Sequence, residues 1–250
     1  MRTKQKLVSK NPYLPKPYKV LDFYRETPDT FTLTIDMAIK HDPGQFVQVS
    51  IPGVGEAPIS ICSDSEKFLK LNIREIGNVT RALAELRSGD TILIRGPYGH
   101  GYPMKEIAGN HLLFIGGGCG IAPLKGIIDY FARELEEWQK QYHMTVTVDQ
   151  NPHGKFCYDA SVEFVTAALE RDHVTNENKV VFVCGPPVMM DKVIKILKNK
   201  GFNDDQIFIS AERLMYCAIG ICCHCMIRGK YTCLDGPVFR YDEVKDYTND

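Results

Sequence analysis

The chain has 250 residues, 44% of them hydrophobic, so it is long enough for two domains that each bury a core of their own. Its 30 Lys and Arg residues nearly balance its 31 Asp and Glu residues, and a formal net charge of −1 argues against a broad nucleic-acid or acidic-membrane footprint. No apolar run approaches the roughly 18 residues of a membrane span, and residues 1–10 are basic but lack the apolar stretch of a secretory signal. We expect a cytoplasmic protein without a membrane span, whose partners are small ligands or proteins and not nucleic acid.

The first hundred residues form short alternating runs of polar and apolar residues, which is typical of β-strands. The clearest runs are residues 31–35, 46–51, 69–73 and 91–94, and clusters of Gly, Pro and Asp separate them. One helix is expected among them, over residues 79–86. About six such strands predict a small antiparallel β barrel, which we assign to a domain over residues 1–106.

After His111 the pattern changes to alternating strands and helices. The apolar run 112–115 leads into the glycine-rich segment 116–120 and then a long helix. Its expected buried face consists of Leu124, Ile127, Ile128, Phe131, Leu135 and Trp138. Further strands are expected at 144–148, 179–184 and 206–209, with helices at 159–171 and 187–200. This order predicts an α/β domain over residues 107–210, built on a doubly wound parallel sheet.

The cysteines are unevenly distributed. Five of the nine lie between Cys217 and Cys233, which favours a metal site in a reducing compartment over disulfides. Cys217, Cys222, Cys225 and Cys233 have the spacing C-x4-C-x2-C-x7-C, and the first three match plant-type 2Fe-2S sites. A structural zinc site is the alternative, although zinc ligands usually come as two short pairs, and unliganded thiols are a third possibility. We expect residues 211–250 to hold a 2Fe-2S cluster and a polar tail, with Cys223 as a spare thiol.

Two segments at the carboxyl edge of the predicted sheet could bind a dinucleotide. The glycines of residues 116–120 allow close backbone approach, and the helix that opens at Ile121-Ala122-Pro123 supplies free amides for a pyrophosphate. Cys184-Gly185-Pro186-Pro187 ends another parallel strand at the same edge. A turn that serves only packing is the alternative. In the first half, residues 57–61 and 74–80 are candidates for a flavin site, and either could instead be an ordinary strand end or helix cap.

Together these motifs resemble the ferredoxin reductase superfamily, in which a flavin-binding barrel precedes a nicotinamide-binding sheet. The chain is most similar to the branch with a C-terminal 2Fe-2S site, which contains the iron-sulfur flavoprotein of anaerobic sulfite reductase, the sulfhydrogenase gamma subunit and the dihydroorotate dehydrogenase electron-transfer subunit. The resemblance covers nearly the whole chain from about Pro17. It is closest to the sulfite reductase and sulfhydrogenase members at residues 44–47 (GQFV), 55–60 (GEAPIS), 95–99 (RGPYG) and 231–239 (YTCLDGPVF).

The resemblance implies FAD, a 2Fe-2S cluster and NAD(P)H as cofactors. It places FAD beside Pro58, Ile59, Ser60, Asn72, Ile73 and Arg74, with its pyrophosphate at Gly77, Asn78, Val79 and Thr80. It places the nicotinamide dinucleotide at Gly117, Gly118, Cys119, Gly120, Ala122, Pro123, Gly185, Pro186 and Pro187, with Cys184 as the catalytic residue. The cluster ligands are then Cys217, Cys222, Cys225 and Cys233.

The chain departs from the family at two places. Ala57 stands where the wider superfamily usually has an Arg that contacts the flavin phosphates. After Phe131, family members usually have another strand and helix, with a loop that helps bind the adenosine end of the nicotinamide cofactor, and this unit is missing here. We therefore expect flavin binding to be more secure than nicotinamide binding.

The resemblance implies an NAD(P)H-dependent flavin and iron-sulfur oxidoreductase subunit. Electrons would pass from NAD(P)H through FAD and the cluster to a catalytic partner, first a sulfite reductase and second a hydrogenase, with a further iron-sulfur subunit as an additional partner. Apolar side chains at residues 237–239 are expected to face that partner. A relay module that no longer binds nicotinamide and a redox sensor are the alternatives.

Overall fold

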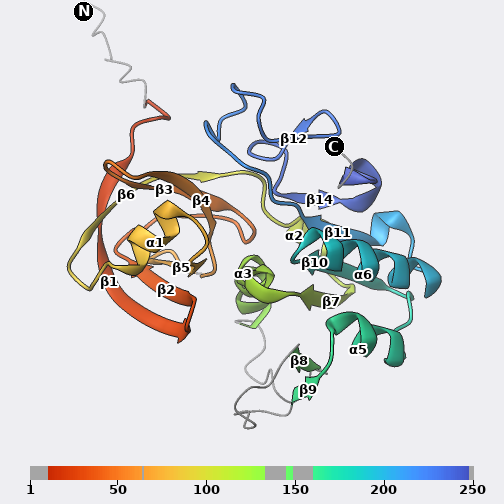
Figure 1. Ribbon diagram of the computed structural model, residues 1–250. Helices are drawn as coiled ribbons and strands as arrows, with labels where there is room; N and C mark the ends of the chain where they lie inside the picture. Colours follow the sequence, from red (N-terminus) through yellow and green to blue (C-terminus); the bar gives the residue numbers. More distant parts are fainter. Residues whose placement is uncertain (1–10, 64, 133–144, 149–159, 248–250) are drawn as a thin grey trace, which may run out of the picture.

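The computed structural model describes residues 11–63, 65–132, 145–148 and 160–247, which form two units and a C-terminal segment (Figure 1). A six-stranded antiparallel sheet makes the first unit, and a parallel sheet with helices makes the second. The cysteine-rich segment follows β11 and contacts both units. None of the helices in the described part of the chain is long and apolar enough to cross a membrane.

The first unit has the strand order β4-β3-β6-β1-β2-β5. Its strands are β1 (Lys16–Thr27), β2 (Thr30–Ile35), β3 (Phe46–Ile51), β4 (Gly55–Ser60), β5 (Leu69–Arg74) and β6 (Thr91–Tyr98). Alternate residues of a strand point to opposite faces, so Phe31, Leu33 and Ile35 of β2 all enter the core and are fully buried. The edge strands approach each other at the bridge between Ile61 and Leu71. The sheet therefore curls as the predicted barrel does, without a continuous ladder of hydrogen bonds to close it.

The second unit has the strand order β14-β11-β10-β7. Strands β7 (His111–Gly116), β10 (Lys179–Cys184) and β11 (Ile207–Ser210) are parallel, as expected, and β14 (Val238–Arg240) joins them antiparallel. Helices α3 (Ile121–Ala132) and α6 (Pro187–Asn199) cover opposite faces of this sheet (Figure 1).

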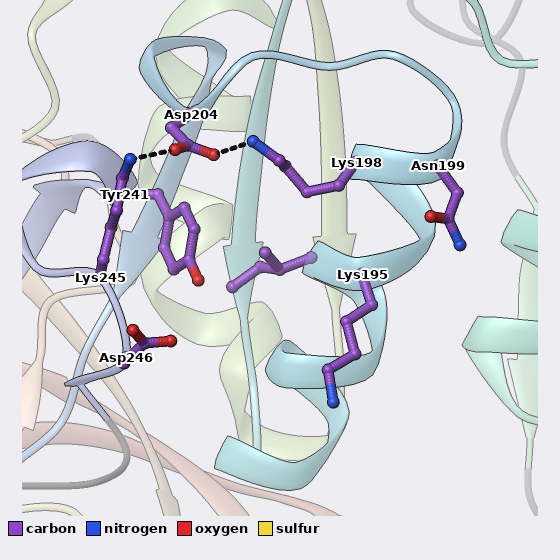
Figure 2. Close-up of a pocket in the computed structure, with 8 residues that line it drawn as sticks. Lys195, Lys198, Asn199, Asp204, Tyr241, Lys245 and Asp246 are labelled. Carbon is purple, nitrogen blue, oxygen red and sulfur yellow. Dashed lines mark hydrogen bonds and ion pairs between the residues drawn. The ribbon is translucent and has the colours of Figure 1, made fainter.

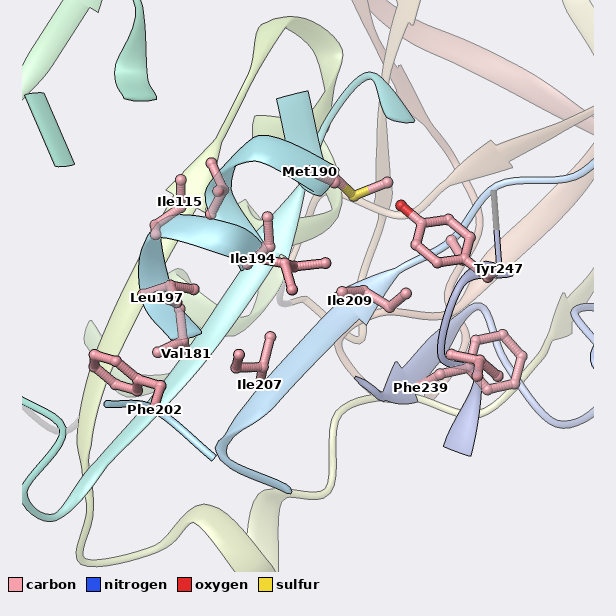
Figure 3. Close-up of a cluster of buried hydrophobic side chains, with 14 of the residues drawn as sticks. Ile115, Val181, Met190, Ile194, Leu197, Phe202, Ile207, Ile209, Phe239 and Tyr247 are labelled. Carbon is pink, nitrogen blue, oxygen red and sulfur yellow. The ribbon is translucent and has the colours of Figure 1, made fainter. Parts of the chain in front are cut away.

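Strand β10 shows why two helices are needed. Its residues Val181 and Val183 point into the core beneath α6, whereas Phe182 points into the core beneath α3. Figure 3 shows the α6 side, where Ile194 and Leu197 lie over the sheet. This two-sided cover leaves the carboxyl ends of the strands as the open edge, where α/β sheets bind ligands.

Shorter elements complete the described chain. They are α1 (Asn78–Ala84), α2 (Met104–Ile107), η1 (Gly118–Gly120), β8 (Val146–Val148), β9 (Ala160–Val162), α5 (Val165–Arg171), η2 (Asp204–Gln206), β12 (Met226–Ile227), β13 (Lys230–Tyr231) and η3 (Tyr241–Glu243). Strands β8 and β9 pair with each other in parallel. Among the described residues, neither pairs with the four-stranded sheet.

The structure corrects three expectations. The helix expected from residue 159 begins at Val165, because Ala160–Val162 pair with β8 as a strand and Val162 has a branched side chain that favours a strand. Gln206 belongs to η2, and the strand starts one residue later. The segment after Ser210 was expected to be loop and tail, but it adds β14 to the sheet.

The shortening expected after Phe131 falls on residues 133–144, which lie outside the described residues, so it stays a prediction. Only residues 133–145 separate α3 from β8, whereas a βαβ unit needs about 30 residues. On the expected buried face of α3, Leu124 and Ile127 are buried and Ile128 is half-buried. Leu135, Trp138 and the side chain of Phe131 lie outside the described residues.

Candidate functional site

A cavity of about 220 Å³ lies where the first unit meets the carboxyl edge of the parallel sheet. From the first unit it is lined by Phe46, Pro58, Ile59, Ser60, Asn72, Ile73, Arg74, Ile76 and Thr80. From the rest of the chain it is lined by Cys119, Ala122, Pro123, Ser210, Glu212, Arg213, Met215 and Pro237. The predicted flavin segments and the glycine loop therefore face one space.

Many of the predicted cofactor-binding residues meet in this cavity. Those that do not line it are Gly77, Asn78, Val79, Gly117, Gly118, Gly120, Gly185, Pro186 and Pro187, which lie at the starts of α1, α3 and α6. Sequence reasoning missed Ser210 and Glu212, although Ser210 ends β11 and strand ends at this edge commonly contact ligands. It also missed Phe46 and Met215, which pack together beside the cysteine loop.

Charges at the cavity are arranged around Arg74 and Glu212. The Nε of Arg74 lies 2.7 Å from Asp29 Oδ2, and hydrogen bonds from Arg74 and Thr27 lower the pKa of Asp29. Glu212 is open to water through the cavity, yet surrounding protein raises the pKa of its carboxyl group by desolvation. The cavity thus has the cationic side chain of Arg74 on the barrel side, and the carboxyl group of Glu212 and the cationic side chain of Arg213 on the sheet side.

The predicted catalytic residue, Cys184, ends β10 with its side chain in the core. It is 1% exposed and does not line the cavity. Burial raises the pKa of its thiol to about 12, and the side chain of Ser210 forms a hydrogen bond with it. Cys184 therefore lies behind Ser210 and is held as a neutral thiol.

The glycine loop contains glycines with two different physical roles. A Cβ atom at Gly120 would lie 2.3 Å from the carbonyl oxygen of Cys184, and one at Gly117 would lie 2.3 Å from the sulfur of Met189. Close packing thus accounts for these two residues. Gly118 has a φ of +56°, and a Cβ there would meet no atom within 4 Å. Only at Gly118, among these three, does open space remain for a ligand to approach the backbone.

The cysteine loop is closed by a tight hairpin. Strands β12 and β13 pair Met226 with Tyr231, and the two turn residues, Arg228 and Gly229, both have positive φ, as a type I′ turn requires. Thr232 is fully buried and donates from its Oγ1 to the carbonyl oxygen of Cys225 at 2.8 Å. The hairpin thereby carries Cys233, the most distant predicted ligand along the chain, back to Cys225.

Backbone amides of this loop point at cysteine sulfurs. The N–H of Gly220 donates to Cys233 Sγ at 3.2 Å, and the N–H groups of Ile219 and Cys222 donate to Cys217 Sγ at 3.5 Å. Ala218 adopts a φ of +61°, a conformation that costs about 1–2 kcal/mol for a residue with a Cβ. Such hydrogen bonds to sulfur are a feature of iron-sulfur sites, so the loop's backbone fits a cluster.

The four thiols form two pairs. Burial raises the pKa of Cys217, but backbone N–H groups and the side chain of Cys222 lower it more, to about 6. Burial and a hydrogen bond with Cys225 raise the pKa of Cys233 to about 12. Among the described residues no three His, Cys, Asp or Glu side chains form a group that could hold a single metal ion. Each pair of thiols could supply two ligands to one iron of a cluster with two irons.

Cys223 differs from the four predicted ligands. Its φ is +58°, its side chain is exposed, and its Sγ lies 3.3 Å from the hydroxyl oxygen of Tyr231. The geometry thus agrees with a spare thiol at this position. His224 is also exposed, and its ring lies tilted against that of Tyr216 with the centroids 4.3 Å apart.

A second cavity, of about 290 Å³, lies between α6 and the C-terminal turn η3 (Figure 2). Asp204 forms ion pairs there with both Lys198 and Lys245. None of the predicted cofactor-binding residues lines this cavity. We therefore do not assign a cofactor to it.

Comparison with known proteins supports both parts of the site. Residues 212–245 match the family model of the iron-sulfur cluster binding domain of dihydroorotate dehydrogenase B, and residues 130–195 match the oxidoreductase NAD-binding domain. Solved structures share the fold. A ferredoxin NADP+ reductase from Neisseria gonorrhoeae has a TM-score of 0.62 at 19% identity, covering 78% of this chain and 97% of that one. The Amycolatopsis cytochrome P450 reductase has a TM-score of 0.64 at 22% identity, covering 77% and 68%.

Two relatives match over most of their length. Sulfhydrogenase 1 subunit gamma of Pyrococcus furiosus is 36% identical over 276 aligned residues, which cover 94% of this chain and 93% of the relative. A probable dihydroorotate dehydrogenase B electron transfer subunit of Thermoplasma volcanium is 33% identical over 234 residues, covering 90% and 89%. The expected cofactors, FAD, an iron-sulfur cluster and NAD(P)H, are those of this group. The chain therefore belongs to the family of NAD(P)H-dependent flavin and iron-sulfur oxidoreductase subunits that includes the sulfhydrogenase gamma and dihydroorotate dehydrogenase electron-transfer subunits.

Proposed function

We propose that the chain carries electrons from NADH or NADPH, through FAD and a 2Fe-2S cluster, to a separate catalytic subunit in the cytoplasm. The observation that carries this proposal is the shared cavity, which brings the barrel, the glycine loop and Met215 of the cysteine segment to one place. FAD supplies the conversion between a hydride, which carries two electrons, and the single electrons that a cluster accepts. The domain boundaries predicted at residues 106 and 210 are part of the same proposal.

In this proposal the first unit binds the flavin, and the second unit binds the nicotinamide dinucleotide. Pro58 and Ile59 would give the flavin ring an apolar wall, Ser60 would add a hydroxyl group beside it, and Arg74 would offer a cationic group to its phosphates. Gly118 gives the dinucleotide a close approach to the backbone. Cys184 shapes the sheet edge from behind Ser210. Cys217, Cys222, Cys225 and Cys233 would hold the cluster.

The predicted partner surface needs a correction. Residues 237–239 were expected to expose apolar side chains, but all three are buried, because β14 joins the sheet. The exposed large apolar side chains of the cysteine segment are instead Leu214, Tyr216, Ile221, Met226 and Leu234, at 40–66% exposure. Such exposed side chains beside an electron exit support a protein partner docking here.

We assign the partner first to a sulfite reductase, on the four sequence motifs of the resemblance, and second to a hydrogenase. The second assignment draws support from the sulfhydrogenase gamma relatives. Purification of the complex from the native host, followed by assays of sulfite and proton reduction driven by NADH and NADPH, separates the two. A monodisperse monomer that reduces sulfite unaided would contradict a separate catalytic subunit.

A relay module without nicotinamide binding is the competing function, and the short connection at residues 133–145 favours it. Anaerobic titration with NADH and NADPH, followed by flavin absorbance, decides between the two. We expect reduction by both cofactors with affinity weakened by about one to two orders of magnitude, because a few adenosine hydrogen bonds at about 1 kcal/mol each are lost. No reduction at about millimolar concentrations, where binding is worth only about 4 kcal/mol, would favour the relay module.

A further inference from the structure

Arg95 of β6 is a buried cation whose hydrogen bonds reach two parts of the molecule. It is 6% exposed, and a guanidinium has five N–H donors. Its Nε and Nη2 donate to the two carboxylate oxygens of Glu56, and its Nη2 also donates to the carbonyl oxygen of Tyr216 at 3.1 Å. Its Nη1 donates to the carbonyl oxygen of Cys217 at 2.7 Å and to the hydroxyl of Tyr98 at 3.3 Å. The five N–H donors of Arg95 therefore make five hydrogen bonds to acceptors within the protein.

Two of these acceptors belong to the cysteine segment. The carbonyl groups of Tyr216 and Cys217 are consecutive, so the planar guanidinium fixes the orientation of the chain at the first predicted cluster ligand. Phe46 of β3 packs against Cys225 and Cys233 in the same region. The cysteine segment is thus held in place by residues of the barrel.

The end of the same strand holds the other side of the loop. His100 donates from its backbone N–H to the carbonyl oxygen of Gly236 at 2.6 Å, and its Nδ1 contacts the carbonyl oxygen of Leu234. A Cβ at Gly99 would lie 2.4 Å from that carbonyl oxygen of Gly236. Residues 95–100 therefore contact the cysteine segment at Cys217, the first predicted ligand, and just after Cys233, the last.

We propose that Arg95, oriented by Glu56, is a positioning residue that seats the cluster loop on the flavin barrel and sets the reduction potential of the cluster. The proposal rests on the proposed function only in assigning the cluster to this loop. Neither residue is a predicted ligand or lines the cofactor cavity.

The two charges should act on the potential with opposite signs. Reduction adds a negative charge at the loop, and the guanidinium contacts the loop directly, so it stabilises the reduced form. The carboxylate of Glu56 accepts from Nε and Nη2 of the same guanidinium, and its negative charge offsets part of that effect. Loss of Arg95 should therefore lower the potential, and loss of the charge on Glu56 should raise it.

The experiment compares midpoint potentials of the purified, cluster-loaded full chain, measured by titration with dithionite and mediators and monitored by electron paramagnetic resonance. Arg95→Gln should lower the potential by at least a tenfold change in the one-electron equilibrium constant, about 59 mV. Glu56→Gln should raise it, and the double variant should return toward the wild type. Arg171→Gln, which removes the ion pairs of Arg171, at the end of α5, with Glu163 and Asp172, is the matched control and should shift nothing.

Arg95→Lys separates the effect of the positive charge from the effect of the hydrogen bonds that hold the loop in place. It keeps the positive charge but loses the forked contacts, so the potential should stay within twofold of the wild-type equilibrium constant. Hydrogen exchange of the amides at residues 216–222 should nevertheless become at least tenfold faster. Shifts of the same sign in Arg95→Gln and Glu56→Gln, or no shift in Glu56→Gln, would overturn the proposal. If Arg95→Gln fails to hold a cluster, Glu56→Gln and Arg95→Lys still decide it. Failure of NADH to reduce the chain would affect the proposed function but not these measurements.

Discussion

The glycine loop at residues 116–120 and the cysteine loop at residues 217–225 both have a constrained backbone, but for different reasons. In the glycine loop, Gly117 and Gly120 lack a Cβ because side-chain and backbone atoms of the neighbouring strand end and helix occupy its place. In the cysteine loop, Ala218 and Cys223 accept positive φ although they carry a Cβ, and nearby amides turn toward sulfur. One loop is shaped by packing inside the fold, and the other by the group it is built to hold.

This difference explains how each loop could be interpreted from sequence. Cysteine spacing is set by ligand geometry, so the spacing alone predicted the site. A glycine-rich turn has the same composition whether it approaches a phosphate or a neighbouring strand. Of Gly117, Gly118 and Gly120, only Gly118 retains open space in the structure.

The largest expected effect is on the cysteine loop. Cys225→Ser should abolish the visible absorption of the cluster, because a buried thiolate paired with Cys233 is lost from the ligand set. Cys223→Ser is the matched control, since that exposed thiol lies against Tyr231, and it should keep the cluster. Retention of a full cluster in Cys225→Ser, or its loss in Cys223→Ser, would show that the ligand set is wrong.

The next effect is on the glycine loop. Gly120→Ala should destabilise the fold by about 3 kcal/mol, the upper end for overpacking, because the new methyl group meets the backbone of Cys184. Gly118→Ala should cost about 1–2 kcal/mol, the conformational penalty alone, because its surroundings are open. Urea unfolding measures both. Equal costs at the two positions would remove the distinction between packing and ligand approach.

A smaller effect is expected at the hairpin. Thr232→Val removes the hydroxyl that donates to the carbonyl oxygen of Cys225 and leaves that oxygen with the backbone bond from residue 232. The expected loss of stability is about 1 kcal/mol, since one acceptor is still partly satisfied. Thr232→Ser keeps the hydroxyl and serves as the control. A loss equal to that of Thr232→Val in the serine variant would point to the methyl group instead.

The smallest effect is a pH dependence from Glu56. Burial raises the pKa of this carboxyl group, but hydrogen bonds from Arg95 and Ser50 outweigh it and hold the pKa below its usual 4.5. The unfolded chain therefore binds more protons, and the ion pair's contribution is present above 4.5 and is lost as the pH falls through the lower folded value. Urea unfolding at about pH 6 and about pH 3.5 should show a smaller acid loss in Glu56→Gln than in wild type. An equal loss would mean that Glu56 does not contribute.

Much of the fold followed from local patterns. The residues of β3, β7 and β10 matched their alternating or apolar runs closely, and Pro187 marked the start of α6. Two features were not predictable in this way. β14 is three residues long and follows a proline, so its strand character comes from pairing with β11. The contact of Arg95 with Cys217 joins residues 122 positions apart, and no local pattern encodes such a contact.

The most direct test of electron flow from the shared cavity into the cysteine loop is anaerobic reduction of the purified chain by NADH and NADPH. Flavin absorbance and cluster electron paramagnetic resonance are recorded together in wild type and in Cys225→Ser. We expect the flavin to bleach in both proteins and a reduced-cluster signal to arise only in wild type. A reduced-cluster signal in Cys225→Ser, or a wild-type protein whose flavin bleaches while its cluster stays oxidised in an acceptor-free solution, would contradict this electron path.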